Sequence, residues 1–188
     1  MTAANPSILI VGTGFAGIGM AIRLKQAGFS DFTLLERADN VGGTWRDNHY
    51  PGAACDIESP LYSFSFEPYP SWTRMFAPQA EILRYLVHCV DKYGLRSHLR
   101  LRTEVTAVRW DEPWGQWDVR TADGQSLRAR VVISCCGGLS RPARPDIPRL
   151  EQFEGKCFHS ARWDHHYSLA GKTVAVIGTG ASAVQLVP

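Results

Sequence analysis

Residues 8–17 of the chain read ILIVGTGFAG, a short apolar run that passes directly into a glycine-rich turn. Four consecutive apolar residues are typical of a parallel strand covered on both faces. From Phe15 to Gln26 apolar residues recur near helical spacing, and Gly28 marks the end of that helix. Phe32–Leu35 is a second apolar run, ending at Glu36. The pattern predicts a strand, a helix and a parallel strand, the start of an α/β fold.

The three glycines of this turn have the spacing G-x-G-x-x-G between the predicted strand and helix. Gly12 permits the tight turn, Gly14 lets the backbone approach a pyrophosphate, and Gly17 allows the helix to pack closely on the strand. The helix N-terminus offers N–H groups to phosphates, and Glu36 can accept ribose hydroxyls. A purely structural turn is the alternative, but the strand, helix and acid in register favour a dinucleotide site.

The rest of the chain contains one further helix and several short strands. Residues 37–76 are rich in Gly, Pro and aromatic residues without a period, which predicts an ordered loop. Residues 78–93 have the apolar spacing of a helix that ends at Gly94. Residues 141–148 form a proline-dense connector. Turn signals separate three alternating segments that we interpret as an inserted β-meander: Leu99–Trp110, Gln116–Thr121 and Ser126–Ile133.

A second glycine turn follows a further apolar run at Thr173–Ile177, which we interpret as a strand. Gly178, Gly180 and Ala183 have the spacing G-x-G-x-x-A, and alanine is permitted in the third place. Two dinucleotide sites in one chain imply two cofactors that exchange electrons. A glycine turn that only packs a helix on a sheet is the alternative here too.

Composition excludes several classes of function. The chain has 188 residues, 45% of them hydrophobic, which excludes disorder. The formal net charge of +2 implies no basic face for nucleic acid. No apolar run is long enough to span a bilayer, and residues 1–7 lack the features of a secretory signal. Five cysteines without C-x-x-C spacing indicate reduced thiols. We therefore expect a cytoplasmic protein without a membrane segment.

Residues 153–164, between the two glycine turns, read FEGKCFHSARWD. Taken alone, four side chains in and after this segment could be either a metal cluster or solvated loop residues: Cys157, His159, His165 and His166. Their spacing does not bring four ligands together, so we expect no metal. In its order and spacing the segment resembles the signature of the class B flavoprotein monooxygenases, and among them the Baeyer-Villiger monooxygenases. Relatives that oxygenate nitrogen or sulfur usually carry Tyr or Phe where this chain has Trp163.

The resemblance implies an FAD-binding Rossmann-like domain with an inserted β-meander at residues 1–140. It implies a linker with the signature at 141–170 and the beginning of an NADPH-binding Rossmann-like domain at 171–188. The implied function is FAD- and NADPH-dependent insertion of one oxygen atom of O2 into a ketone through a flavin C4a-peroxide. The alternatives are an N- or S-oxygenating flavin monooxygenase and a non-catalytic FAD-binding fragment. We expect the 188-residue chain alone to bind FAD without turning over.

The resemblance also assigns roles to residues. Asp56 takes the place of an aspartate that pairs with an arginine later in the chain, although an Asp in a loop is more often a turn cap. His159 and Trp163 are expected to couple domain movement to catalysis, and with Asp56 they complete the candidate catalytic set. Gly137 is kept as a contact although Cys135 and Cys136 replace the small residues usual before it. The candidate cofactor-binding residues are Gly12, Gly14, Phe15, Gly17, Glu36, Arg37, Gly43, Thr44, Trp45, Asp56, Val105, Gly137, Gly178, Gly180 and Ala183.

Overall fold

The computed structural model describes residues 7–188. The prediction that the chain has no secretory signal concerns residues 1–7, and residues 1–6 lie outside the described part. The chain divides into two compact units. The first takes in the chain up to residue 43 together with residues 83–138, and the second takes in residues 44–82 and 139–188. These two units are defined by packing, whereas the sequence divides the chain by expected cofactor binding. The predicted division into segments 1–140, 141–170 and 171–188 therefore stays a prediction.

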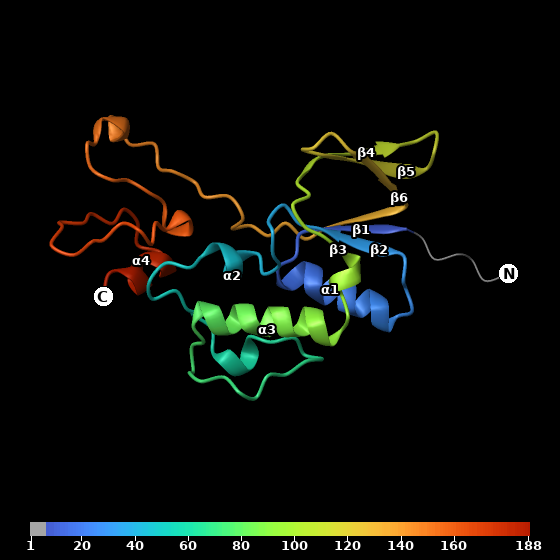
Figure 1. Cartoon of the computed structure of the whole chain (residues 1–188), viewed down its shortest axis with the longest axis horizontal. Coiled ribbons are helices and arrows are strands. Elements are labelled where there is room, and N and C mark those ends of the chain that lie inside the picture. The colour runs from blue at the N-terminus through green and yellow to red at the C-terminus, as the bar shows by residue number, and fades with distance from the viewer. Residues whose placement is uncertain (1–6) are drawn as a thin grey trace. The chain divides into compact units, whose positions relative to one another are not determined.

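The first unit is built on a four-stranded sheet in the order β3-β2-β1-β7, with all neighbours parallel (Figure 1). In the central strand β1, Ile8 lies opposite Phe32 of β2 and opposite Val131 of β7. Ile10 and Leu34 are fully buried, and burial on both faces explains the continuous apolar runs. The predicted α/β class is confirmed. The strands are β1 (Ile8–Val11), β2 (Phe32–Leu35), β3 (Leu99–Arg100) and β7 (Val131–Ser134).

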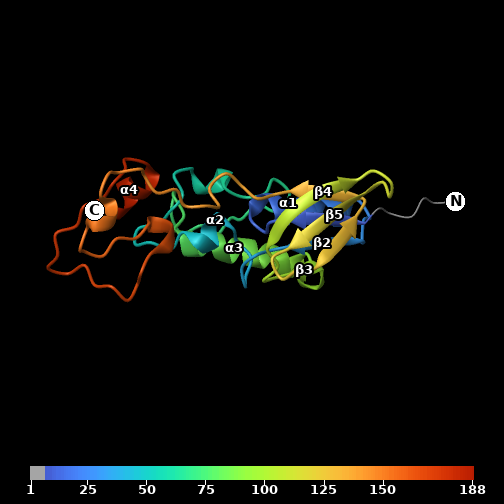
Figure 2. The same cartoon turned by 90° about the horizontal axis from the view of Figure 1, so that it is seen from above.

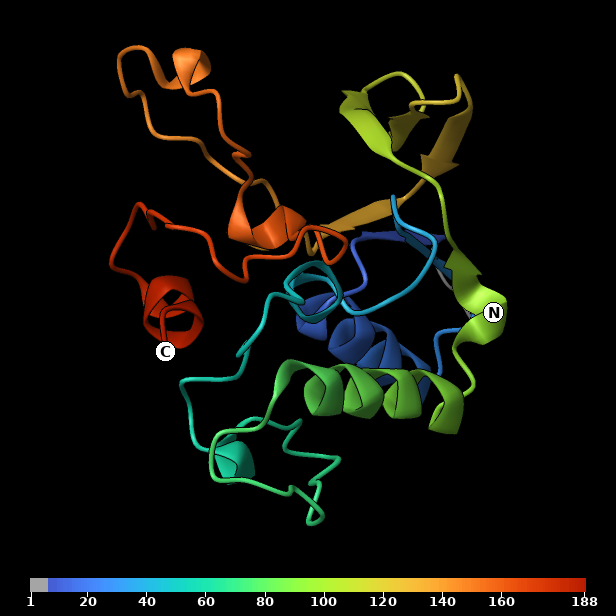
Figure 3. The ribbon, with the colours of Figure 1, turned by 60° about the vertical axis from the view of Figure 1, so that its left-hand side comes forward.

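Two helices pack together on one side of this sheet (Figures 1 and 3). They are α1 (Phe15–Gln26) and α3 (Gln79–Lys92), close to the bounds that the sequence predicts. The ring centroids of Phe15 and Tyr85 lie 6.1 Å apart between them. The fully buried side chains recur at three- and four-residue spacing, as a helix with one apolar face requires: Ile18, Ala21, Ile22, Leu86, Cys89 and Val90.

The predicted β-meander is present on the opposite side of the sheet, and seen from above it lies over α1 and β2 (Figures 1 and 2). Val119 and Ala129 of the meander pack in one cluster with Leu9 and Leu35 of the parallel sheet. Its antiparallel strands are β4 (Val105–Asp111), β5 (Gln116–Thr121) and β6 (Ser126–Ala129).

Two predicted meander strands are divided between the two sheets. The predicted strand Leu99–Trp110 contains β3 and β4, and only β4 belongs to the meander. The predicted strand Ser126–Ile133 contains β6 and β7, separated at Arg130, whose N–H donates to the carbonyl of Ser7 at 3.1 Å. The apolar residues of β7 then add to the parallel sheet beside β1, where their backbone groups find partners.

The second unit is mostly irregular, as predicted for residues 37–76. It contains α2 (Thr44–Asp47), α4 (Ala181–Leu186) and 3-10 turns at Ser59–Leu61, Leu150–Gln152 and Ser160–Arg162.

The predicted strand at Thr173–Ile177 is wrong for this structure, because a strand needs hydrogen-bonded neighbours and residues 7–188 offer it none. Val174 and Ile177 are accordingly 51% and 60% exposed. Within residues 7–188, no helix combines the length and the apolar character that crossing a membrane requires.

Candidate functional site

The first glycine turn has a backbone that side chains would obstruct. Gly12 has φ of +103°, and a Cβ there would lie 2.5 Å from the carbonyl oxygen of Cys135. A Cβ on Gly17 would lie 2.0 Å from the carbonyl oxygen of Gly12, so this glycine allows α1 to approach the turn. The roles assigned to these two glycines from the sequence therefore agree with the packing.

Gly14 differs from the other two glycines because a side chain would fit. Its φ is −79°, and a Cβ there would meet only the Cα of Gly43, at an ordinary 3.7 Å. Gly14 is the N-cap of α1, and no acidic side chain lies in the first turn of this fully described helix. The first N–H groups of an α-helix have no acceptor within the helix, and a helix N-terminus beside a glycine turn is the arrangement that binds phosphate.

Glu36, at the carboxyl end of β2, holds the same turn by hydrogen bonds. Its carboxylate accepts from the Thr13 hydroxyl at 2.5 Å, from the Thr13 N–H at 3.2 Å and from the Ala38 N–H at 3.0 Å. The side chain is 4% exposed. The sequence predicts a ribose contact for Glu36 but not this internal role, whose signal is the threonine inside the glycine motif. Any further donor to this carboxylate would share it with these three hydrogen bonds.

The remaining candidates in the first unit surround this edge of the sheet. Gly43 has φ of +52°, and Gly42 beside it donates its N–H to the Thr13 carbonyl at 2.9 Å. Gly137 follows β7 with φ of +67°, and a Cβ there would have open space around it. Arg37 is exposed, whereas Val105 packs against the core cluster under the meander. The carboxyl ends of β1, β2 and β7 thus meet where parallel sheets bind ligands.

In the second unit, Thr44 and Trp45 begin α2. The Trp45 indole N–H donates to the Tyr62 hydroxyl at 3.0 Å, and burial raises the pKa of Tyr62. The Trp45 carbonyl accepts from the Gln79 side chain. Trp45 is therefore fixed at both its backbone and its ring.

The segment that leads to Asp56 is fixed by its backbone while the Asp56 side chain is exposed. Ala54 forms an antiparallel bridge with Pro78, and the Cys55 N–H donates to the Ala77 carbonyl at 2.9 Å. Cys55 is 4% exposed, and this burial raises the pKa of its thiol. An exposed carboxylate on an anchored backbone can act on a bound molecule.

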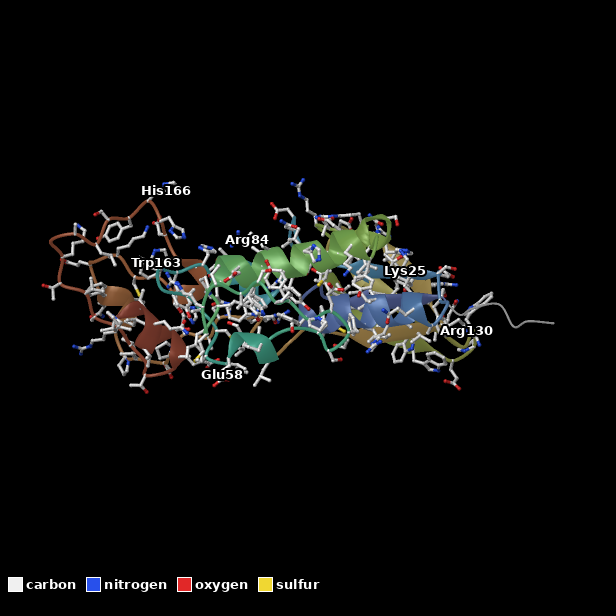
Figure 4. All side chains as sticks on the ribbon, turned by 90° about the horizontal axis from the view of Figure 1, so that it is seen from below. Lys25, Glu58, Arg84, Arg130, Trp163 and His166 are labelled. Carbon is white, nitrogen blue, oxygen red and sulfur yellow. The ribbon has the colours of Figure 1, made fainter. Side chains whose placement is uncertain are left out.

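The signature segment folds on itself. The His159 Nδ1 accepts from the Ala161 N–H at 3.0 Å and so caps a 3-10 turn. Trp163, labelled in Figure 4, packs edge-on against Phe158 with ring centroids 5.1 Å apart. The Lys156 ammonium lies 3.0 Å from the Asp164 carboxylate and lowers the pKa of Asp164. His159 and Trp163 thus have local structural partners.

The candidate metal ligands of this segment do not converge. His165 stacks on His49, with Nε2 of His165 2.7 Å from Nδ1 of His49. No group of three or more His, Cys, Asp or Glu side chains suited to a metal ion occurs in the described part of the chain.

The second glycine turn leads directly into α4. Gly178 has φ of +123°, Gly180 is the N-cap, and the Ala183 N–H donates to the Gly180 carbonyl at 2.9 Å. Gln185, which no sequence motif marks, reaches from α4 to the loop at Tyr50 and Ala54. No local pattern indicates this pairing, because it joins parts of the chain 131 residues apart.

Comparisons with known proteins agree with this geometry. A family model described as pyridine nucleotide-disulphide oxidoreductase matches residues 9–187. A Baeyer-Villiger monooxygenase of Streptomyces coelicolor is 56% identical over 181 residues, which cover 96% of this chain and 35% of the relative. The chain thus spans about a third of the length of this curated relative.

Solved structures show the same likeness. A cyclohexanone monooxygenase with bound ε-caprolactone matches with a TM-score of 0.89 and 38% identity, covering 97% of this chain and 37% of that one. A structure of OTEMO in complex with FAD and NADP matches with a TM-score of 0.89 and 36% identity, covering 98% of this chain and 37% of that one.

Proposed function

Because this chain belongs to the pyridine nucleotide-disulphide oxidoreductase family, within the class B flavoprotein monooxygenases of the Baeyer-Villiger type, we propose that it binds FAD at its first glycine turn and NADPH at its second. The observation that carries the proposal is the space at Gly14, where the fold tolerates a Cβ but the chain has none. That space suits a pyrophosphate lying against the backbone.

The chain's own residues supply the binding shell. The N–H groups at the start of α1 hydrogen-bond the pyrophosphate, and Glu36 orients the adenosine ribose. Gly43 and Gly137 of the first unit are proposed as flavin contacts, and Thr44 and Trp45 of the second unit are proposed as flavin contacts as well. Phe15, Arg37 and Val105 are proposed as further contacts.

The second glycine turn is proposed to hold NADPH in the same way. The helix α4 begins at Gly180 as α1 begins at Gly14, so its first N–H groups are the proposed phosphate donors. Gly178 provides the positive φ of the turn, and Ala183 occupies the third position of the motif.

The whole protein is proposed to be a monooxygenase that inserts one oxygen atom of O2 into a ketone, with NADPH as the source of electrons. When bound, the flavin supplies the electron transfer and the activation of oxygen. Asp56 is proposed to set the charge around the flavin from its exposed position at the end of an anchored loop. His159 and Trp163 are proposed to couple movement of the linker to catalysis. A cytoplasmic location is part of the proposal, because all five cysteines are free thiols.

FAD binding is tested by two matched glycine variants. Gly14→Ala fits the protein without a clash but places a methyl group where the pyrophosphate must lie. We expect an unchanged melting temperature and at least about tenfold weaker FAD binding, since about 1.4 kcal/mol corresponds to a factor of ten. Gly180→Ala, equally free of clashes, should leave FAD binding unchanged and weaken NADPH binding. Unchanged FAD affinity in Gly14→Ala contradicts the proposed site.

The reaction is tested in the full-length protein by NADPH-dependent oxygen uptake with a cyclic ketone and with a thioether. A lactone product supports the proposed function. A sulfoxide without lactone indicates the N- or S-oxygenating alternative, and no uptake with either substrate indicates a non-catalytic flavin protein. Trp163, where heteroatom-oxygenating relatives usually carry Tyr or Phe, favours the lactone.

A further inference from the structure

The side chain of Gln185 makes three hydrogen bonds that join α4 to the loop before Asp56. Its Oε1 accepts from the Tyr50 hydroxyl at 2.8 Å and from the Ala54 N–H at 3.3 Å. Its Nε2 donates to the Ala54 carbonyl at 2.9 Å. The amide therefore pairs with both backbone groups of Ala54, as a neighbouring strand would.

This pairing requires an amide at this position. A carboxylate would place an oxygen against the Ala54 carbonyl, and an apolar side chain would leave the part-buried backbone groups without these partners. The approach is close at the backbone as well, because a Cβ on Gly52 would lie 2.3 Å from the Gln185 carbonyl oxygen. Gly52 has φ of +80°, so this glycine serves both the turn and the contact.

The same loop is held on its other side by the residues that lead into α3. The Gln79 N–H donates to the Ala53 carbonyl at 2.9 Å, and the Cys55 N–H donates to the Ala77 carbonyl at 2.9 Å. Asp56 thus follows a backbone segment that is fixed from two sides, and only the Gln185 side belongs to the helix after the second glycine turn.

We propose that Gln185 is a positioning residue, which holds the backbone before Asp56 in register with the helix of the second dinucleotide site. This role rests on the proposed function, in which Asp56 acts on the flavin and α4 receives NADPH. A displacement of α4 reaches Asp56 through the amide of Gln185 and the backbone of Ala54. Flavin reduction by NADPH then depends on a side chain whose hydrogen bonds go to Tyr50 and Ala54.

Thiol labelling tests the contact without any activity measurement. Cys55 lies next to Ala54 and is 4% exposed, whereas Cys89 is fully buried in α3 and serves as an internal reference. In Gln185→Leu we expect iodoacetamide to modify Cys55 at least about tenfold faster by peptide mass spectrometry, with Cys89 unchanged. Tyr50→Phe removes one of the three bonds and should give a smaller increase. The matched control Gln26→Leu changes an exposed amide on α1 and should change neither cysteine.

The positioning role is tested in the full-length protein by anaerobic reduction with NADPH. Gln185→Leu should retain FAD and lower the maximal rate of flavin reduction at least about tenfold, while the NADPH concentration that gives half of this rate changes less than threefold. An unchanged Cys55 labelling rate overturns the proposal. Faster labelling with an unchanged reduction rate also overturns it, because Gln185 is then only structural. If Gln185→Leu does not fold, Tyr50→Phe is judged by the same two measurements.

The proposed function fails separately from this inference. Wild-type protein without FAD contradicts the proposed cofactor site, whereas the labelling comparison still decides whether Gln185 holds the loop.

Discussion

Replacing Glu36 should weaken both the fold of the first unit and its affinity for FAD. The carboxylate accepts two short bonds, from the Thr13 hydroxyl at 2.5 Å and the Ala38 N–H at 3.0 Å. Hydrogen bonds to a charged group contribute about 1.5–3 kcal/mol each, so Glu36→Ala should lower the free energy of unfolding by about 3–6 kcal/mol. That is a large part of the stability of an ordinary domain.

Two further variants separate the contributions to stability and binding. In Glu36→Gln the amide oxygen still accepts from Ala38 and its N–H₂ donates to the Thr13 hydroxyl. The Thr13 N–H loses its acceptor, so the stability loss should be about 1–3 kcal/mol. Its FAD affinity should still fall about tenfold, because the charged acceptor for the ribose is lost. Thr13→Val removes one bond within the protein and should lower stability while largely retaining FAD.

Urea unfolding of the FAD-free protein, followed by far-UV circular dichroism, gives the stability differences. Quenching of flavin fluorescence gives the dissociation constants. A free energy of unfolding for Glu36→Ala within about 0.5 kcal/mol of wild type would refute the role of Glu36 in holding the turn. Lower stability with unchanged FAD affinity would show that Glu36 is structural only.

Three other changes have specific expected results. Gly17→Ala places a Cβ 2.0 Å from the carbonyl oxygen of Gly12. We expect the free energy of unfolding measured in urea to fall by at least about 3 kcal/mol, since even milder overpacking costs about 1–3 kcal/mol. Burial raises the pKa of Cys55 above its ordinary value of 9.0, and the thiolate is the form that reacts. The rate at which iodoacetamide labels Cys55 should therefore still rise with pH above 9.0. A rate that becomes constant below pH 9.0 contradicts the raised pKa. Lys156→Met should raise the pKa of Asp164 towards its ordinary value in an NMR titration. The folded-state pKa of Asp164 is lowered, so the Lys156–Asp164 pair stabilises the fold above the ordinary pKa of an aspartate. This stabilisation is lost as the pH falls through the lowered pKa. Lys156→Met should lack this loss of stability at acidic pH.

Local patterns predicted the features that depend on neighbouring residues in the sequence. The strand, glycine turn and helix at residues 8–26 were correct because the apolar runs and the close approach of Gly17 to Gly12 lie within that segment. The helix α3 was correct because its apolar period is long and regular.

The features that depend on distant partners were missed. The division of residues 126–133 between two sheets depends on pairing of β7 with β1, which no local pattern indicates. The run at Thr173–Ile177 has the composition of a strand, but a strand exists only with hydrogen-bonded neighbours. The pairing of Gln185 with Ala54 joins two segments that are distant in sequence, so neither segment alone predicts it.

The position of β7 in the parallel sheet determines when the first glycine turn can be completed during synthesis. Arg130 donates to Ser7 across 123 residues, and the carbonyl of Cys135, just after β7, lies against Gly12. A ribosome adds about 5–20 residues per second, so the nascent turn waits on the order of ten seconds for its last neighbouring strand. Over that interval β1 keeps one edge unpaired, because its neighbour β7 has not yet been made. Slow codons before residue 131 would lengthen this exposure, and faster translation of the meander would shorten it.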